Sequence, residues 1–225
     1  MIKKINVAGM ELDNSTVRES ILQLEASMGG GRFHTIQEIT MNTIMRAEEN
    51  DKVKEAIQRL SHSIIADVGI LDAVGESSLQ RKHEIVDRDF FFEFMRRLEK
   101  MQKPVFLLGR DVVATQAAHD YIMEEFPKMN VAGLEALENS PNQTESIINE
   151  INVVAPTVII SVIPSPEQEL FMLENRDKLS AEVWYGIGDA LEGQRGHRLL
   201  HFVQHAMGVR KLVKSISEYK KLEEV

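Results

Sequence analysis

The chain has 225 residues, of which 43% are hydrophobic and 27% are charged, and these values are ordinary for one globular domain. It contains no cysteine, which excludes disulfides, zinc–thiolate sites and thiol nucleophiles and fits a reducing compartment. The net charge of −9 argues against nucleic acid as a partner. No stretch approaches the ~18 apolar residues of a membrane-spanning helix, so we expect a cytoplasmic protein.

Positive charge is concentrated near the end of the chain. We expect residues 1–193 to form one domain and residues 194–225 to form a short basic helical segment. Such a segment could touch an anionic membrane surface, but a solvated helix face explains the same residues equally well. Between Arg195 and Lys221 the basic residues are Arg195, Arg198, Arg210, Lys211, Lys214, Lys220 and Lys221, with only Glu218 against them.

Short apolar runs rich in β-branched residues alternate along the chain with longer segments of helical period. Strands that are apolar throughout indicate a parallel sheet covered on both faces. The sequence therefore predicts a Rossmann-like α/β fold with a mainly parallel sheet and helices on both faces. The predicted strands are Ile2–Ala8, Arg32–Ile36, Ser63–Ala66, Pro104–Leu108, Asn130–Gly133, Thr157–Ile163 and Glu182–Ile187. The predicted helices are Asp13–Met28, Glu38–Asn50, Asp51–Leu60, Asp89–Lys100, Val112–Phe126, Gln143–Asn152 and Pro166–Leu179.

Ligands of parallel α/β sheets bind beyond the carboxyl ends of the strands. The residues that follow each predicted strand are therefore the first candidates for a site. They are Gly9–Asp13, Thr35–Gln37, Asp67–Gly69, Gly109–Asp111, Gly133, Pro164–Gln168 and Gly186–Asp189.

Two of these turns carry residues suited to chemistry. Gly109 and Arg110 separate a buried strand from a helix, where the helix N-terminus and the arginine could hold a phosphate. The alternative is a tight turn with Asp111 as the helix N-cap, and neither a dinucleotide-binding nor a P-loop motif is present. Asp67 ends an apolar strand, which suits a general base, although a lone aspartate in this place is more often a cap.

Two further patterns bear on metal binding. Asp87 and Asp89 superficially match a DxD metal-binding motif, but Asp89 precedes a helix and is better interpreted as its N-cap. His197, His201 and His205 share one helix face, and two such histidines could hold zinc, yet no carboxylate at ligand spacing completes the site. We therefore expect no metal and no other cofactor.

Taken in order, the segments resemble the WecG/TagA/CpsF family of bacterial glycosyltransferases over roughly Ile5 to Gly193. The resemblance is specific because the segments follow one another as they do in the family. They are Asn6–Asp13; Phe33–Gln37, similar to the family's H-T-x-N; Ile64–Asp67, before its D-G-x-G; Pro104–Gly109 and later Phe126-Pro127; Ile148–Asn152; Pro164–Glu169, similar to G-x-P-K-Q-E; Glu174–Leu179; and Tyr185–Gly188.

This resemblance implies a metal-independent, inverting glycosyltransferase of cell-envelope polysaccharide synthesis. The family transfers an N-acetylhexosamine, typically N-acetylmannosamine, from UDP to a lipid-diphosphate-linked acceptor. Its members form oligomers and use a C-terminal appendage at the membrane, which implies a homo-oligomer peripheral to the inner face of the plasma membrane. Asp67 would be the base that deprotonates the acceptor hydroxyl. The nucleotide or sugar would be bound by Thr35, Gln37, Gly109, Arg110, Gln168, Gly186 and Gly188.

Several residues on the ligand side depart from the family pattern. Exchange of positive for negative charge beside a diphosphate is unfavourable, so a second hypothesis is a non-catalytic interaction or regulatory protein that keeps the scaffold. The enzyme hypothesis is favoured over the non-catalytic one if Arg81, Lys82 or Arg110 points into the cleft that would bind the sugar nucleotide. The departures are Gln37 for asparagine, Val68 for glycine, Glu84 for arginine, Asp87 for glycine, Pro164 for glycine and Glu167 for lysine.

Overall fold

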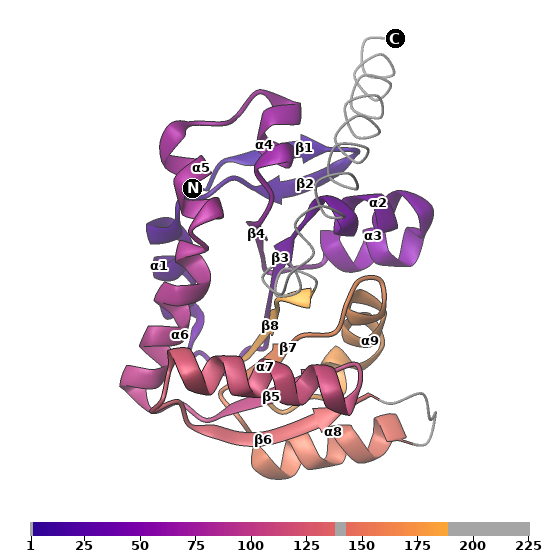
Figure 1. Ribbon diagram of the computed structural model, residues 1–225. Helices are drawn as coiled ribbons and strands as arrows, with labels where there is room; N and C mark the ends of the chain where they lie inside the picture. The colour runs from indigo at the N-terminus through magenta and orange to yellow at the C-terminus, as the bar shows by residue number, and fades with distance from the viewer. Residues whose placement is uncertain (1, 138–142, 189–225) are drawn as a thin grey trace.

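The computed structural model of the protein describes residues 2–137 and 143–188. Its centre is a six-stranded parallel sheet with the strand order β4-β3-β8-β7-β5-β6, which confirms the predicted fold class (Figure 1). The strands are β3 (His34–Ile39), β4 (His62–Ile65), β5 (Val105–Gly109), β6 (Val131–Ala136), β7 (Val158–Ser161) and β8 (Val183–Gly186).

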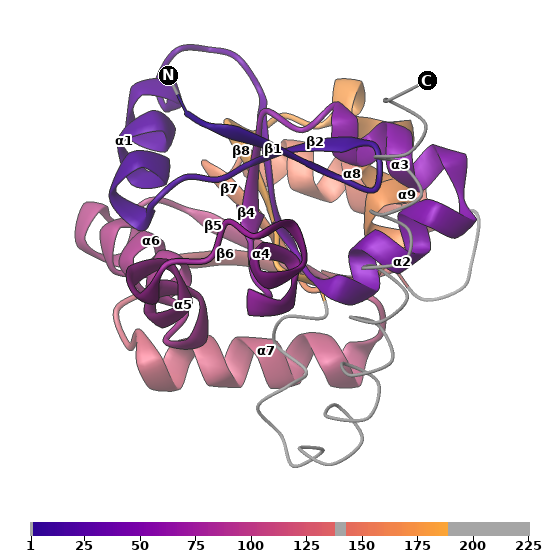
Figure 2. The ribbon, with the colours of Figure 1, turned by 90° about the horizontal axis from the view of Figure 1, so that it is seen from above.

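Helices cover both faces of this sheet, and Figure 2 shows α1 and α6 on one side and α3 and α9 on the other. The helices are α1 (Val17–Ser27), α2 (Met41–Glu49), α3 (Asp51–Gln58), α4 (Val68–Val74), α5 (Leu79–Val86), α6 (Asp89–Met101), α7 (Val112–Glu125), α8 (Gln143–Val154) and α9 (Glu167–Asn175), followed by the short 3-10 helix η1 (Arg176–Lys178). None of the helices in the described part of the chain is long and apolar enough to cross a membrane.

Two apolar layers hold these helices to the sheet. On one face, Phe90, Phe91 and Phe94 of α6 pack with α1 and α7 against alternate residues of the central strands. On the other face, α8 and α9 pack against the residues in between, with Trp184 of β8 completely buried. The central strands are therefore apolar on both sides, which is the reason their sequences show no alternation.

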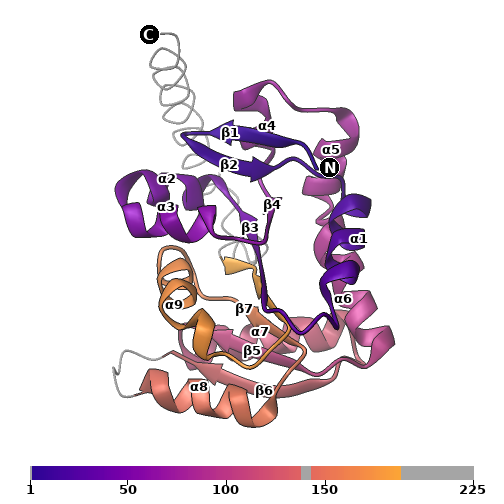
Figure 3. The ribbon, with the colours of Figure 1, turned by 180° about the vertical axis from the view of Figure 1, so that it is seen from behind.

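The first predicted strand does not belong to the main sheet. β1 (Lys4–Val7) and β2 (Met10–Asp13) form a separate antiparallel hairpin, which lies beside α4 in Figures 1 and 3. The two-residue loop has positive φ at both Ala8 and Gly9, as in one of the two common turn types of tight hairpins. The prediction was therefore wrong for this strand, because six of the seven predicted strands belong to the main sheet and the first does not. For the same reason, the Gly9–Asp13 segment does not follow a strand of the main sheet.

The hairpin is tied to the beginning of β4 by buried polar groups. The Asp13 carboxylate accepts a hydrogen bond from the Ser63 backbone N–H at 2.9 Å and lies 3.2 Å from His62 Nδ1 and 3.0 Å from Lys4 Nζ. Burial opposes the negative charge of Asp13, but these partners outweigh it and hold the pKa of Asp13 well below its usual range. Asp13 therefore has a structural role.

Candidate functional site

The carboxyl ends of the six strands define one edge of the sheet. Along it, the β4 end leads to Asp67, the β8 end comprises Gly186 and Gly188, and the β5 end comprises Gly109. With neighbouring strands about 4.8 Å apart, the ends of β4 and β8 are about 10 Å apart, and those of β4 and β5 about 19 Å. The predicted site residues that do lie at this edge are therefore spread along much of its length.

Asp67 is half-buried at the N-terminus of α4. Its backbone is extended, and its Oδ1 accepts a hydrogen bond from the Gly69 N–H at 2.8 Å, so the residue does act as a helix cap. The cap does not exclude a second role, because a carboxylate has two oxygens and about four acceptor positions. The cap fixes the orientation of the carboxyl group at the edge of the sheet.

Thr35 lies at the opposite edge, contrary to the prediction. It is the second residue of β3, it is completely buried, and its Oγ1 accepts a hydrogen bond from the Ser61 N–H at 3.1 Å. The strand continues to Ile39, which places Thr35 about 13 Å from the carboxyl end. The difference arises because β3 contains two polar residues, Gln37 and Glu38, which in the sequence look like the residues that follow a strand.

Gln37 and Gln168 are buried close to the carboxyl edge. Gln37 is paired in register with Gly186 of β8, and its side-chain amide donates a hydrogen bond to the Glu169 carboxylate on α9. Gln168 packs so closely beneath the end of β8 that a Cβ on Gly186 would lie 2.8 Å from its Nε2, and one on Gly188 3.2 Å away. The structure therefore brings Gln37, Gln168, Gly186 and Gly188 together, in a buried cluster.

Gly109 and Arg110 lead from β5 into α7 as expected. Asp111 is the N-cap of α7 and accepts a hydrogen bond from the Ala114 N–H at 2.8 Å, which confirms the capping interpretation. A Cβ on Gly109 would overlap the side chain of Thr115 in the first turns of α7. Arg110 is exposed, and its Nε lies 3.4 Å from the Asp111 carboxylate.

A residue pair that the sequence prediction missed lies directly beyond β3. Thr40 caps α2 through a hydrogen bond from the Thr43 N–H to its Oγ1, and Asn42 is exposed in the first turn. Thr40-Met41-Asn42 has the T-x-N spacing that was assigned to Thr35 and Gln37, five residues further along the chain. The signal was present in the sequence, but it depends on where β3 ends.

Three basic residues that could serve a phosphate are paired with carboxylates. Arg81 is buried with its Nη1 2.5 Å from Glu84, and Lys82 Nζ lies 2.8 Å from Asp72. The hydrogen bond from Lys82 lowers the pKa of Asp72 below its usual value. Together with the contact between Arg110 and Asp111, these pairs reduce the positive charge available to a ligand.

The Asp87-Arg88-Asp89 segment begins α6 in a way that differs from the prediction. The N-cap is Arg88, in a left-handed conformation with φ of 54°, and Asp89 is the first helical residue. Burial and the neighbouring charges of Asp87 and Glu84 raise the pKa of Asp89. The Arg88 guanidinium lies 4.5 Å from the ring centre of Phe91 and 3.5 Å from the Glu38 carboxylate.

Metal-binding side chains do not gather in this part of the molecule. Among residues 2–137 and 143–188, no group of three or more histidine, aspartate or glutamate side chains could hold a metal ion. The face formed by His197, His201 and His205 and the basic segment 194–225 lie outside the described residues.

The geometry describes a Rossmann-like α/β domain with a half-buried carboxylate and several helix N-termini at one edge of its sheet. A family model described as "Glycosyl transferase WecG/TagA/CpsF family" matches residues 5–198, and the chain belongs to this family of glycosyltransferases. One curated relative is the N-acetylglucosaminyldiphosphoundecaprenol N-acetyl-beta-D-mannosaminyltransferase of Staphylococcus aureus strain MW2, 19% identical over 97% of this chain and 87% of the relative. The protein of the same name from strain NCTC 8325 / PS 47 is 21% identical over 84% of this chain and 74% of the relative.

Proposed function

We propose that the protein transfers an N-acetylhexosamine, similar to N-acetylmannosamine, from a UDP-sugar to a lipid-diphosphate-linked acceptor, with inversion at the anomeric carbon. The observation that carries the proposal is the family match over residues 5–198 together with the position of Asp67 at the carboxyl edge. The names of the relatives support both an N-acetylmannosaminyl group and a lipid-diphosphate acceptor.

In the proposed mechanism, Asp67 is the general base. Its carboxylate takes the proton of the acceptor hydroxyl as the hydroxyl oxygen attacks the anomeric carbon. The bond from that carbon to the diphosphate oxygen breaks on the opposite face, and UDP leaves with the electron pair. The hydrogen bond from the Gly69 N–H orients the carboxylate, and a single base on one face is what an inverting transfer requires.

Donors for the nucleotide and the departing diphosphate are available along the carboxyl edge. The helices α2 and α7 both begin just beyond the ends of their strands, so their N–H groups and positive dipole ends lie at this edge. We propose that Thr40 and Asn42 contact the nucleotide or sugar, in place of Thr35. In this proposal Gln37 and Gln168, which are buried, support the end of β8, Gly186 and Gly188 form the wall of the site, and Gly109 and Arg110 extend it along the edge.

A lipid-linked acceptor places the reaction at a membrane surface. We therefore propose a cytoplasmic homo-oligomer that works as a peripheral protein at the inner face of the plasma membrane, with basic residues of the segment 194–225 contacting anionic lipid.

The deciding experiment compares the wild type with Asp67→Asn. The substitution keeps the shape of the side chain and removes its basicity, so it should lower turnover by about 100- to 10,000-fold and leave UDP affinity nearly unchanged. Turnover is measured as UDP release from UDP-N-acetylhexosamines with a lipid-diphosphate acceptor, and binding by calorimetry. Equal turnover in the two proteins would remove Asp67 from the mechanism.

The ion pairs of Arg81, Lys82 and Arg110 favour a second candidate function. Because carboxylates neutralise the charges of these three residues, the carboxyl edge of the sheet is less suited to a diphosphate. This is expected of a non-catalytic interaction protein that keeps the scaffold. A wild-type protein that neither binds UDP nor turns over a UDP-sugar would support this function over the enzyme.

A further inference from the structure

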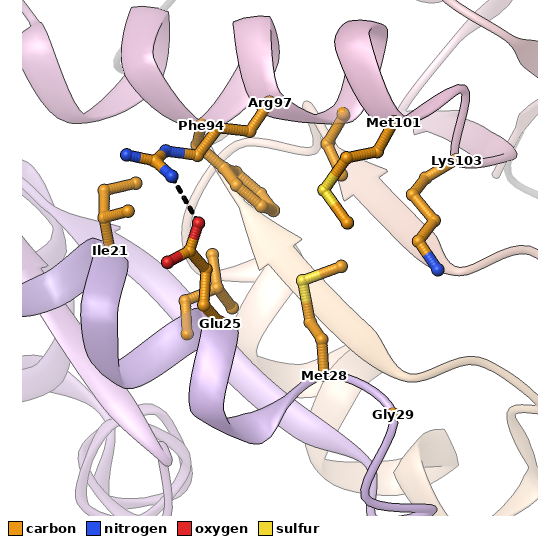
Figure 4. Close-up of a pocket in the computed structure, with 10 residues that line it drawn as sticks. Ile21, Glu25, Met28, Gly29, Phe94, Arg97, Met101 and Lys103 are labelled. Carbon is orange, nitrogen blue, oxygen red and sulfur yellow. Dashed lines mark hydrogen bonds and ion pairs between the residues drawn. The ribbon is translucent and has the colours of Figure 1, made fainter.

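A cavity lies between α1 and α6, away from the carboxyl edge. It has a volume of about 300 Å³, and its walls are mostly apolar. Figure 4 shows Met28 and Met101 pointing toward one another across it, from the end of α1 and the end of α6. Leu24, Phe94 and Leu98 complete the apolar walls, and Lys103 lies at one side.

This cavity is separate from the site of the proposed transfer. Both helices end where the chain returns to the beginning of a strand, α1 through the Gly29–Gly31 turn to β3 and α6 through residues 102–104 to β5. The cavity therefore lies toward the amino ends of the strands. Since β5 is five residues long, the two edges are about 13 Å apart.

The charges that line the cavity leave one ammonium group for a ligand. Glu25 forms an ion pair with Arg97, which also contacts the Glu93 carboxylate at 2.8 Å. Within the described residues, Lys103 forms no ion pair. Arg97 is thus shared by two carboxylates, and the Glu182 carboxylate accepts a hydrogen bond from the Gly29 N–H at 2.8 Å. Among the charged lining residues, Lys103 is the cation without a carboxylate partner in the described part of the chain.

The cavity has the size and the flexible walls of a small-molecule site. Ligand sites in proteins start at roughly 300 Å³ and combine apolar walls with a few polar groups, whereas an engineered cavity of about 150 Å³ suffices for benzene. Methionine side chains adapt to ligands of different shape because they are unbranched and polarisable. At the mouth, Gly29 has φ of +82° and a Cβ placed there would meet nothing within 4 Å, so this side of the cavity is open.

We propose that this cavity binds a small amphiphile that has an apolar chain and one anionic head group. The chain lies between Met28 and Met101, and the carboxylate or phosphate head contacts the Lys103 ammonium group. The mostly apolar walls disfavour a sugar or a nucleotide as the occupant, and the Lys103 ammonium group favours an anion over a neutral or cationic amphiphile.

The test measures binding of decanoate, decyl phosphate and decanol to the full-length protein below the concentrations at which they form micelles. Titration is followed by calorimetry and by the NMR signals of the methionine methyl groups. We expect both anions to shift the Met28 and Met101 methyl signals and to bind more tightly than decanol. Lys103→Gln should weaken the anions about 2- to 5-fold and leave decanol unchanged, since one partly exposed ion pair is lost.

Two kinds of variant keep the result interpretable. Lys100→Gln is the matched control, because Lys100 is an exposed lysine of α6 outside the cavity. Met28→Trp and Met101→Trp fill the cavity from different helices, and each should abolish binding of all three probes. Absence of anion binding to the wild type, unchanged affinity in both filled variants, or equal losses in Lys103→Gln and Lys100→Gln would each overturn the proposal. None of these outcomes bears on turnover of UDP-sugars.

Discussion

At the carboxyl edge, three glycines are constrained by their neighbours inside the protein. A side chain on Gly109 would overlap Thr115, and side chains on Gly186 and Gly188 would press on Gln168. These contacts require glycine whether or not a ligand is bound, so a loss of activity on replacing them would report packing as well as binding. Exposed polar residues at the same edge are better probes of the ligand, and Asn42 is one of them.

Asn42→Ala should weaken UDP-sugar binding while leaving the fold intact. Loss of one neutral hydrogen bond to the ligand costs about 0.5–1.5 kcal/mol, or roughly 2- to 12-fold in affinity. Because Asn42 is exposed, the urea midpoint should change little. The contrasting variant is Thr35→Val, which alters a buried hydrogen bond at the far edge and should lower stability without changing affinity. If Thr35→Val weakened binding and Asn42→Ala did not, Thr35 would belong to the site and Asn42 would not.

At the scale of helices and strands, the sequence predicts the central sheet well and its surroundings less well. β5, β7 and β8 are apolar on both faces, and such runs have few other interpretations. The helix α5 was missed because its pattern is inverted: Leu79 and Val86 are exposed, and Arg81 is buried against Glu84. The end of β3 was misjudged because Gln37 and Glu38 find partners on α9 and β8, which only tertiary structure supplies.

The contact between the hairpin and β4 predicts how stability depends on pH. The lowered pKa of Asp13 means that the folded protein holds this carboxylate ionised more strongly than the unfolded chain does. Its contribution is therefore present above about pH 4, the pKa of an unfolded aspartate, and is lost as the pH falls toward the folded value. Asp13→Asn should lower the free energy of unfolding by about 1.5–3 kcal/mol at pH 7 and by less near pH 3.

Urea unfolding of both proteins across this pH range measures the difference. Glu11→Gln is the control, because Glu11 is an exposed carboxylate on the same strand as Asp13. If Asp13→Asn and the wild type lose stability in parallel as the pH falls, the Asp13 carboxylate is not the group responsible.

At the scale of the whole molecule, the two edges of the sheet present different chemistry. The carboxyl edge carries Asp67, Asn42 and helix N-termini, which suit a polar, anionic donor and an acceptor hydroxyl. The cavity toward the amino edge is apolar with one lysine. The net charge of −9 opposes any anion that approaches the protein, so local cations decide where an anion binds. Arg81 is held by Glu84, and removal of the Glu84 carboxylate tests whether it is such a cation.

Glu84→Gln should therefore raise the affinity for UDP if Arg81 belongs to the donor site. Arg81 would lose its 2.5 Å contact with a carboxylate. Gln80 and the Val17 N–H donate to different oxygens of Glu84, and a glutamine keeps one acceptor oxygen, so it can accept one of these two hydrogen bonds. We expect an increase of about 2- to 5-fold at low salt and a smaller one at high salt. Because the Arg81–Glu84 pair is largely buried, the variant should also be less stable than the wild type. The matched control is Glu55→Gln, which frees Arg59 from a 2.6 Å ion pair on α3 and changes the net charge equally, from −9 to −8. Arg59 follows α3 just before the start of β4, at the opposite edge, so this control should leave UDP affinity unchanged.

Calorimetry with UDP at two salt concentrations distinguishes an effect of Arg81 from an effect of net charge. Equal increases in the two variants would indicate a general effect of net charge, and no increase in Glu84→Gln would place Arg81 outside the donor site.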